Sequence, residues 1–170
     1  MANPTMTLIA SNTVGSGGVS SVTFSSIPAT YTDLVVKSSP RFDEAYSSDT
    51  MKVSFNGSTS TFTYRILVGN GSSAASYNNT FGNAGDINAA TSTSNTFSNM
   101  EMYIPNYTSS NNKSFSVDSV SENNGTAAIA DLIAGLWSTT SAITSITFTP
   151  YSGGNFVQYS TFYLYGINNS

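Results

Sequence analysis

Two chemically versatile residue types are absent from this sequence of 170 residues, which contains neither cysteine nor histidine. Without cysteine no disulfide can form, and the sequence gives no indication of a redox compartment. Cys–His pairs, Ser-His-Asp triads and the usual zinc ligands are excluded as well. We therefore expect a protein that is not an enzyme, with no catalytic residues, no metal and no cofactor.

Charge is also scarce, with five basic and nine acidic residues and a net charge of −4. The basic residues are scattered along the chain, whereas nucleic-acid binding needs a clustered basic face and anionic lipid needs a polybasic segment. No apolar run approaches the roughly 18 residues of a membrane-spanning helix. The first basic residue is Lys37, so no secretory signal is predicted. We expect neither nucleic acid nor membrane as a partner.

Uncharged polar residues take the place of charge: the chain has 31 serines, 22 threonines and 18 asparagines. It also has ten phenylalanines and ten tyrosines, so that aromatic residues make up 12% and charged residues 8%. Disordered chains show the opposite balance. The length suits one folded domain, which we place at 1–170.

Alternation of apolar and polar residues, bounded by turn residues, is the dominant pattern and predicts β-strands. The segment 51–56 is the clearest case, because Met51, Val53 and Phe55 share one face of a strand and polar residues share the other. An Asn-Gly turn follows at 56–57. Further strands are predicted near 6–10, 22–24, 34–36, 62–68, 100–104, 115–117, 127–137, 146–148 and 159–167.

These nine or ten strands, with no convincing helix, predict an all-β fold. One-sided alternation is typical of antiparallel sheets with one wet face, and the strand spacing is typical of a sandwich or barrel. On strand count we predict an antiparallel, jelly-roll-like β-sandwich with extra strands; an immunoglobulin-like sandwich is the alternative. The glycine-rich segment 15–18 is interpreted as a hairpin turn between the first two strands.

Two segments break the pattern and are predicted to be long loops, 40–50 and 69–99. The first holds the densest charge of the chain, and the second is rich in small and polar residues without clear periodicity. Loops this long are uncommon unless they are functional or disordered. From these loops we select interface candidates, namely Arg41, Phe42, Tyr46, Tyr77, Phe81 and Ile87.

The last predicted strand carries bulky residues on both faces, which indicates that both are covered. Phe162 and Leu164 lie on one face, while Tyr163 and Tyr165, preceded by Tyr159, lie on the other. Aromatic residues are enriched at subunit interfaces. We therefore predict a homo-oligomer in which Tyr163 and Tyr165 belong to the interface.

The sequence leaves three weaker chemical alternatives. Lys37, Lys52 or Lys113 could in principle form a Ser-Lys dyad, although a solvated lysine is the commoner role. Acidic residues could bind a cation or hydrolyse glycosides, but nothing pairs them; they include Asp43, Glu44, Asp49, Glu101, Asp118 and Glu122. Trp137 could stack on a sugar, but a core or subunit-seam position is favoured.

Several segments together resemble a known group of proteins. They are IPATYTDLVV at 27–36, FNG at 55–57, IPNY at 104–107, GLW at 135–137 followed by ITSI at 143–146, and STFYLYGI at 160–167. In these the chain resembles a β-sandwich domain of tailed-bacteriophage virion proteins, notably of cyanophages. That domain recurs in tail-fibre tips and in capsid decoration (cement) proteins, and the resemblance brings no catalytic residues.

The resemblance implies a capsid decoration protein, which would clamp major capsid protein subunits on the virion surface after synthesis in the host bacterial cytoplasm. Such proteins often form trimers, so a homotrimer is expected. The first strand is predicted near Met6, which leaves no room for a fibre stalk and favours this role. The alternative is the receptor-binding tip of a tail or head fibre, which would recognise host glycan with Trp137, Tyr46, Tyr77 and Phe81.

Overall fold

The computed structural model describes residues 5–121 and 128–168, and every regular element in them is a β-strand. The all-β prediction is confirmed, with twelve strands against the nine or ten expected. Their bounds are β1 Met6–Thr13, β2 Val22–Phe24, β3 Asp33–Ser39, β4 Ser48–Phe55, β5 Phe62–Gly69, β6 Ala74–Asn79, β7 Asn83–Asn88, β8 Asn99–Ile104, β9 Lys113–Ser121, β10 Ile129–Trp137, β11 Ile146–Pro150 and β12 Thr161–Ile167.

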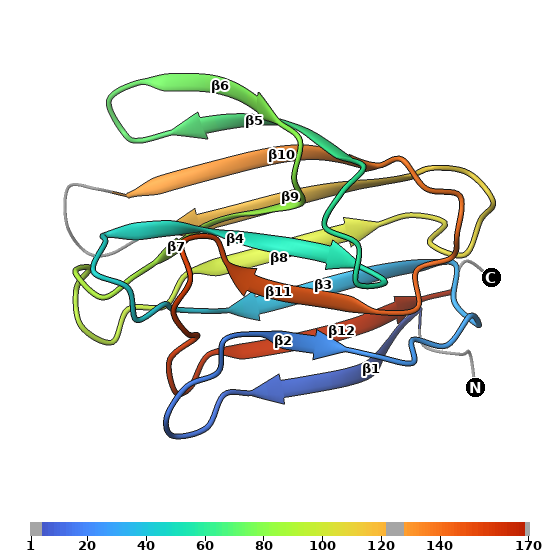
Figure 1. The fold of residues 1–170 in the computed structure, drawn as a ribbon, viewed down its shortest axis with the longest axis horizontal. Coiled ribbons are helices and arrows are strands. Elements are labelled where there is room, and N and C mark those ends of the chain that lie inside the picture. Colours follow the sequence, from blue (N-terminus) through green and yellow to red (C-terminus); the bar gives the residue numbers. More distant parts are fainter. Residues whose placement is uncertain (1–4, 122–127, 169–170) are drawn as a thin grey trace.

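The strands form two antiparallel sheets packed face to face, which confirms the β-sandwich (Figure 1). The wide sheet has eight strands in the order β1-β12-β3-β8-β9-β10-β5-β6, and the narrow sheet has four in the order β2-β11-β4-β7. In Figure 1 the narrow sheet lies in front of the wide sheet, and β5 and β6 extend above it. The wide sheet therefore has one face on the core and one face turned outward.

The strand order is that of a jelly roll with two inserted hairpins. Without β5, β6, β9 and β10, the remaining strands follow the order β1-β12-β3-β8 in one sheet and β2-β11-β4-β7 in the other, which is the double Greek key of a jelly roll. The hairpins β5–β6 and β9–β10 widen the first sheet beyond β8. The extra strands that the sequence predicted are thus located in two connections of the frame.

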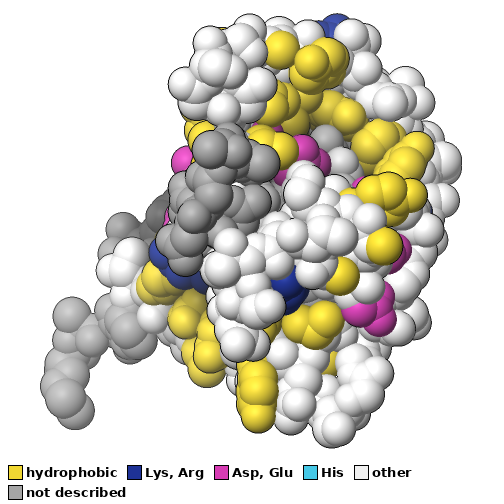
Figure 2. All heavy atoms as spheres, turned by 90° about the vertical axis from the view of Figure 1, so that its left-hand side faces the viewer, with side chains coloured by type: hydrophobic (Ala, Val, Ile, Leu, Met, Phe, Trp, Pro, Cys, Tyr) yellow, Lys and Arg dark blue, Asp and Glu magenta, His cyan; other side chains and the backbone are white. Residues whose placement is uncertain are grey.

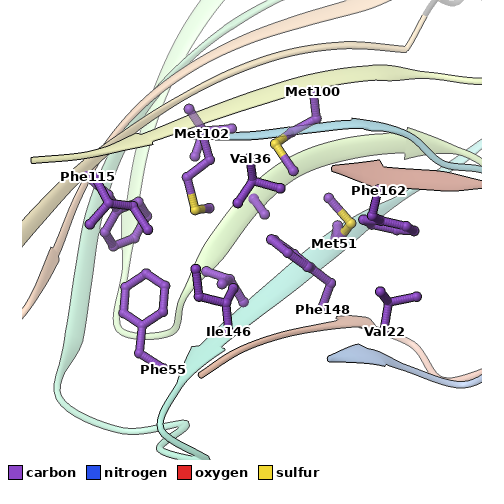
Figure 3. Packing of buried hydrophobic residues seen from close by; sticks show 14 of the residues in the cluster. Val22, Val36, Met51, Phe55, Met100, Met102, Phe115, Ile146, Phe148 and Phe162 are labelled. Atoms are coloured by element: carbon purple, nitrogen blue, oxygen red, sulfur yellow. The ribbon is translucent and has the colours of Figure 1, made fainter. Parts of the chain in front are cut away.

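The core lies between the two sheets and is built from the apolar face of each strand. Figure 3 shows Val36, Met102 and Phe115 of the wide sheet pointing toward Phe55 and Phe148 of the narrow sheet. All five are at most 2% exposed. Because apolar area removed from water contributes about 25 cal/mol per Å², this layer is the main source of stability for the sandwich.

Gly135 opens the space that one core ring needs. It is the direct cross-strand partner of Phe115 in the β9–β10 pair. A Cβ atom at Gly135 would lie 2.1 Å from Cζ of the Phe115 ring. This glycine therefore lets the ring lie against the strand backbone, where a side chain would collide with it.

The sequence-based expectations for three connections need correction. The turn at 15–18 does not form a hairpin, because β1 belongs to the wide sheet and β2 to the narrow sheet. Segment 69–99 is not one long loop, because β6 and β7 lie within it and leave 89–98 as the loop. The predicted loop 40–50 is shorter than expected, since β4 begins at Ser48.

Candidate binding surface

The outward face of the wide sheet is not covered by any other layer of the described residues. Strand register places outward side chains in rows across it, and one row runs from Glu101 through Asp118 and Leu132 to Leu67. Leu132 and Leu67 are direct cross-strand partners, 57% and 50% exposed. Two half-exposed leucines side by side on a sheet form an apolar patch of the kind that binds a partner.

This patch forms part of a hollow of about 780 Å³ that spans β5, β6, β8, β9 and β10. Arg65, Tyr103 and Asp118 also line the hollow, so that an apolar centre is bordered by an aromatic ring and by both signs of charge. A mainly apolar hollow with a few polar groups is the usual composition of a binding site. The outward face of β8–β9–β10–β5–β6 is therefore the candidate site, which we call the sheet hollow.

The ring of Tyr103 is held in place at the border of the sheet hollow. Its hydroxyl donates a 2.7 Å hydrogen bond to Oδ2 of Asp33, which is 4% exposed. The backbone N–H of Asn106 donates to the other oxygen of Asp33, at 2.8 Å. The hydrogen bond to Asp33, burial and the negative charge of that carboxylate raise the pKa of Tyr103. The phenol therefore stays protonated at neutral pH and presents a fixed, 37% exposed ring.

The exposed charges on this face balance, and the further carboxylate of the face, that of Asp33, is nearly buried. Lys37 and Glu101 form an ion pair with Nζ and Oε2 2.6 Å apart, and Arg65 and Asp118 add one charge of each sign. Exposed ion pairs contribute little to folding stability. For binding, the exposed charges of the two signs cancel, so that this face offers no strongly basic surface for nucleic acid or for a strongly acidic partner.

A second hollow of about 540 Å³ adjoins the first and shares Asn99 and Glu101 with it. It is lined by Tyr163 and Tyr165, whose rings stack with centroids 6.5 Å apart. The structure thus brings these two predicted interface residues together on the outward face. Tyr163 is 36% exposed there, and Tyr165 is partly buried.

Three of the other predicted interface residues are buried in the protomer, so their selection has to be corrected. Arg41, Phe42 and Ile87 are 7%, 0% and 0% exposed. The Arg41 guanidinium holds loop 89–98 in place by donating to the carbonyl oxygens of Ala90, Ser92, Thr93 and Thr96 at 2.8 to 3.4 Å. Phe42 packs on Phe156 with ring centroids 5.1 Å apart. These residues support the loops from within.

The remaining candidates are accessible but lie apart from the sheet hollow. Tyr46 is 55% exposed on the loop before β4, and Tyr77 is 58% exposed on β6, on the side opposite to the hollow. Phe81 is half-buried between the rings of Tyr64 and Tyr151, each with its centroid 5.2 Å away. Trp137 is 2% exposed and packs on Phe55 and Phe62, which confirms its core position and rules out stacking on a sugar.

Sequence reasoning missed Leu67, Leu132 and Tyr103 as site residues. A signal was present, since Leu67 and Tyr103 occupy the polar phase of alternating strands. An apolar residue in that phase must be exposed or covered by a partner. The sequence of a single strand cannot show that β5, β8 and β10 belong to the same sheet and present these side chains on the same face.

The acidic residues form structural contacts. Asp43 accepts hydrogen bonds from the backbone and side-chain nitrogens of Asn155, and Asp49 accepts two from Ser152. Burial and the carboxylates of Asp49 and Asp43 raise the pKa of Glu44 to about 7. Across 5–121 and 128–168, no cluster of acidic residues is arranged to hold a metal ion. The candidate acid Glu122 lies outside the described residues.

Two further buried groups have structural partners. Asp131 is 1% exposed and accepts hydrogen bonds from the Asp86 backbone and from Ser119 Oγ; burial and the Asp86 charge raise its pKa to about 6. Lys113, one of the lysines considered for a dyad, is 1% exposed and donates to the carbonyl oxygens of Ser109 and Asn111. A substrate has no access to either side chain.

The end of the sandwich carries few charges. Figure 2 views the left side of Figure 1 and shows mainly backbone and uncharged polar atoms, with hydrophobic side chains in both the upper and the lower half. The described residues form no helix that could cross a lipid bilayer.

No family model, curated protein or solved structure matches the chain significantly.

Proposed function

We propose that this protein is a non-enzymatic structural protein of a bacteriophage virion, of the capsid decoration type. In this proposal it binds the outer surface of the head as a homo-oligomer and stabilises the lattice of major capsid protein. The observation that carries the proposal is the uncovered sheet hollow, with Leu67 and Leu132 half-exposed at its centre.

The composition of the hollow favours a protein partner of neutral surface. An apolar centre with a polar, charge-balanced rim is the anatomy of a protein–protein interface. The hollow is concave, so it fits a convex surface, such as a ridge or loop of the capsid shell. Two copies of the same concave face would not fit one another, which argues that this face binds a different protein.

The chemistry of the chain supports a role without catalysis. It has no histidine or cysteine, and its buried carboxylates and lysine serve packed loops and strands. A permanent shell protein needs a well-packed core and a surface with few charges, and this chain has both. The trimer implied by the resemblance to phage proteins stays a prediction.

The experiment uses the phage that encodes the chain, with heads prepared without this protein. Purified protein is added, and the bound copies are counted after sedimentation of the heads. The double variant Leu67→Ser/Leu132→Ser should bind at least tenfold more weakly, and Tyr46→Ser, equally exposed but on a loop, should bind normally. Equal binding by the double variant would contradict the proposed surface, and detection of the chain at the tail alone would contradict the proposed role.

Glycan recognition by a fibre tip is a second candidate, favoured by one observation. The half-exposed ring of Tyr103 is fixed by its hydrogen bond and lines the same hollow as Arg65, Asp118 and Asn99. A hollow that holds a fixed ring and hydrogen-bonding groups can stack on a sugar and bind its hydroxyls. On a glycan array, this function predicts a signal that Tyr103→Ala abolishes. No signal on any glycan, together with tight binding to heads, would leave decoration as the function.

A further inference from the structure

β6 is a sheet edge that lacks every common protection against strand pairing. Natural edge strands are shortened, bulged, charged or interrupted by proline. Among the four edges of the described sheets, β2 has three residues, β1 and β7 each belong to a pair with a register shift, and β7 carries Asp86. β6 pairs with β5 without any shift over six residues, and its sequence AASYNN has no charge and no proline.

The free backbone groups of β6 can be assigned from its register. The N–H of Asn70 donates to the carbonyl oxygen of Ser73 at 3.1 Å. Bonded and non-bonded pairs alternate in an antiparallel ladder, so every second residue of β6 bonds to β5. The backbone N–H and C=O groups of Ala74, Ser76 and Asn78 therefore point away from β5.

We propose that two copies of this chain pair through β6 in antiparallel fashion, with the two-fold axis at Ser76, so that their wide sheets join into one. This register is the one that uses all three outward residues: Ser76 faces Ser76 of the second copy, and Ala74 faces Asn78. It forms about six backbone hydrogen bonds. The proposal deepens the self-association part of the proposed function and rests on it, with a two-fold dimer in place of the trimer that the resemblance implies.

Side chains fit the same register. Tyr77 lies on the side opposite to the sheet hollow, and the pairing places it across from Ala75 of the second copy, whose small side chain leaves room for the exposed ring. The nearest charge on the adjacent strand is Arg65, the partner of Asn78. The two copies of Arg65 are kept roughly 14 Å or more apart by the intervening strands, beyond the screening length of about 8–10 Å. No like charges meet.

The pairing is tested on the purified full-length chain by sedimentation equilibrium at micromolar concentration. The wild type should form a dimer. Ser76→Pro removes the central outward N–H while keeping the β5 ladder and should weaken the dimer at least tenfold; Ser76→Ala keeps the N–H and should leave it unchanged. A monomeric or trimeric wild type, or a dimer unaffected by Ser76→Pro, would overturn the proposal.

A second measurement does not depend on dimer strength. Because the chain has no cysteine, Ser76→Cys introduces a single thiol. Bonded antiparallel partners have Cα atoms about 5.5 Å apart, within disulfide reach, so mild oxidation should yield a covalent dimer. Ser72→Cys, in the same hairpin but roughly 26 Å from its copy, should not cross-link. Equal cross-linking of both variants would contradict the register. Binding of a monomer to heads would overturn the pairing and the homo-oligomer but leave the proposed attachment to the capsid standing.

Discussion

Tyr103 and Asp33 join two neighbouring strands through a diagonal hydrogen bond of 2.7 Å on the outward face of the wide sheet. Asp33 lies at the start of β3 and is nearly buried, and Tyr103 lies on β8 at the border of the sheet hollow. The carboxylate thereby fixes the one aromatic ring among the described residues that line the sheet hollow. The candidate site and the stability of the sheet therefore depend on the same contact.

Tyr103→Phe should separate these two roles. The ring stays while the hydrogen bond to a charged acceptor is lost, so the free energy of unfolding should fall by about 1–2 kcal/mol. Urea unfolding gives this value, and Tyr163→Phe is the matched control, because no described residue bonds its hydroxyl. If partner binding drops while stability is unchanged, the hydroxyl contacts the partner directly and the positioning role is wrong.

Gly135→Ala should destabilise the protein, because the new methyl group would collide with the Phe115 ring. Overpacking of this kind costs about 1–3 kcal/mol. The urea midpoint should fall with an unchanged m-value. The smaller side chain of Phe115→Leu, placed in the Gly135→Ala background, should restore part of the loss. A neutral Gly135→Ala would show that the strand backbone can move aside.

Arg41→Ala should free the loop 89–98, whose carbonyl oxygens accept hydrogen bonds from its guanidinium. Loss of a buried, hydrogen-bonded cation should cost about 2–4 kcal/mol. Limited proteolysis should then cut within 89–98 before any other segment. Arg41→Lys should rescue little, since a lysine cannot reproduce the planar fork of donors. Arg65→Ala, an exposed arginine, should leave the cleavage pattern unchanged.

Stability should rise as the pH falls from about 7.5 to 5. Burial and nearby carboxylates raise the pKa of Glu44 from 4.5 to about 7 and that of Asp131 from 3.8 to about 6. In this window the folded chain holds protons that the unfolded chain has released, so the free energy of unfolding decreases with increasing pH. The stabilisation is complete below the pKa values that these carboxyl groups have in the unfolded chain, and it is lost as the pH rises through their folded-state pKa values of about 6 and 7. Urea midpoints at several pH values measure it.

The amide variants assign this pH dependence to its sources. Glu44→Gln should flatten the plot of unfolding free energy against pH between pH 5 and 7. Asp131→Asn should flatten the same plot between pH 4 and 6. Neither should alter the profile above pH 8, where both wild-type groups are ionised. A wild-type profile that rises with pH across this window would contradict the burial of these carboxylates.

The sequence was a good guide to strands that face the core on one side. Met51, Val53 and Phe55 are buried as their alternation predicts, and Trp137 lies in the core as favoured. The jelly-roll-like sandwich followed from strand number and turn spacing. These features are local, since a strand with one apolar face must bury that face wherever the chain takes it.

The parts that were missed depend on contacts between distant segments. β6 shows no apolar alternation, because its edge position leaves nearly all of its side chains exposed. β7 is buried but built from Asn83, Ala84 and Gly85, and its polar atoms are satisfied within the core. The sheet hollow arises from the register of five strands, which no single segment encodes. Arg41 looked like a surface charge because its acceptors lie some fifty residues away.

The insertion of β5–β6 between β4 and β7 has a practical consequence for engineering. The turn at 70–73 is the tip of a hairpin whose outer strand, β6, pairs only with β5, and its residues are exposed. A foreign peptide grafted there would project from the rim of the wide sheet and would not interrupt the Greek-key connections. The chain is therefore suited to epitope display, because a graft at this turn lies outside the strands that form the jelly-roll frame.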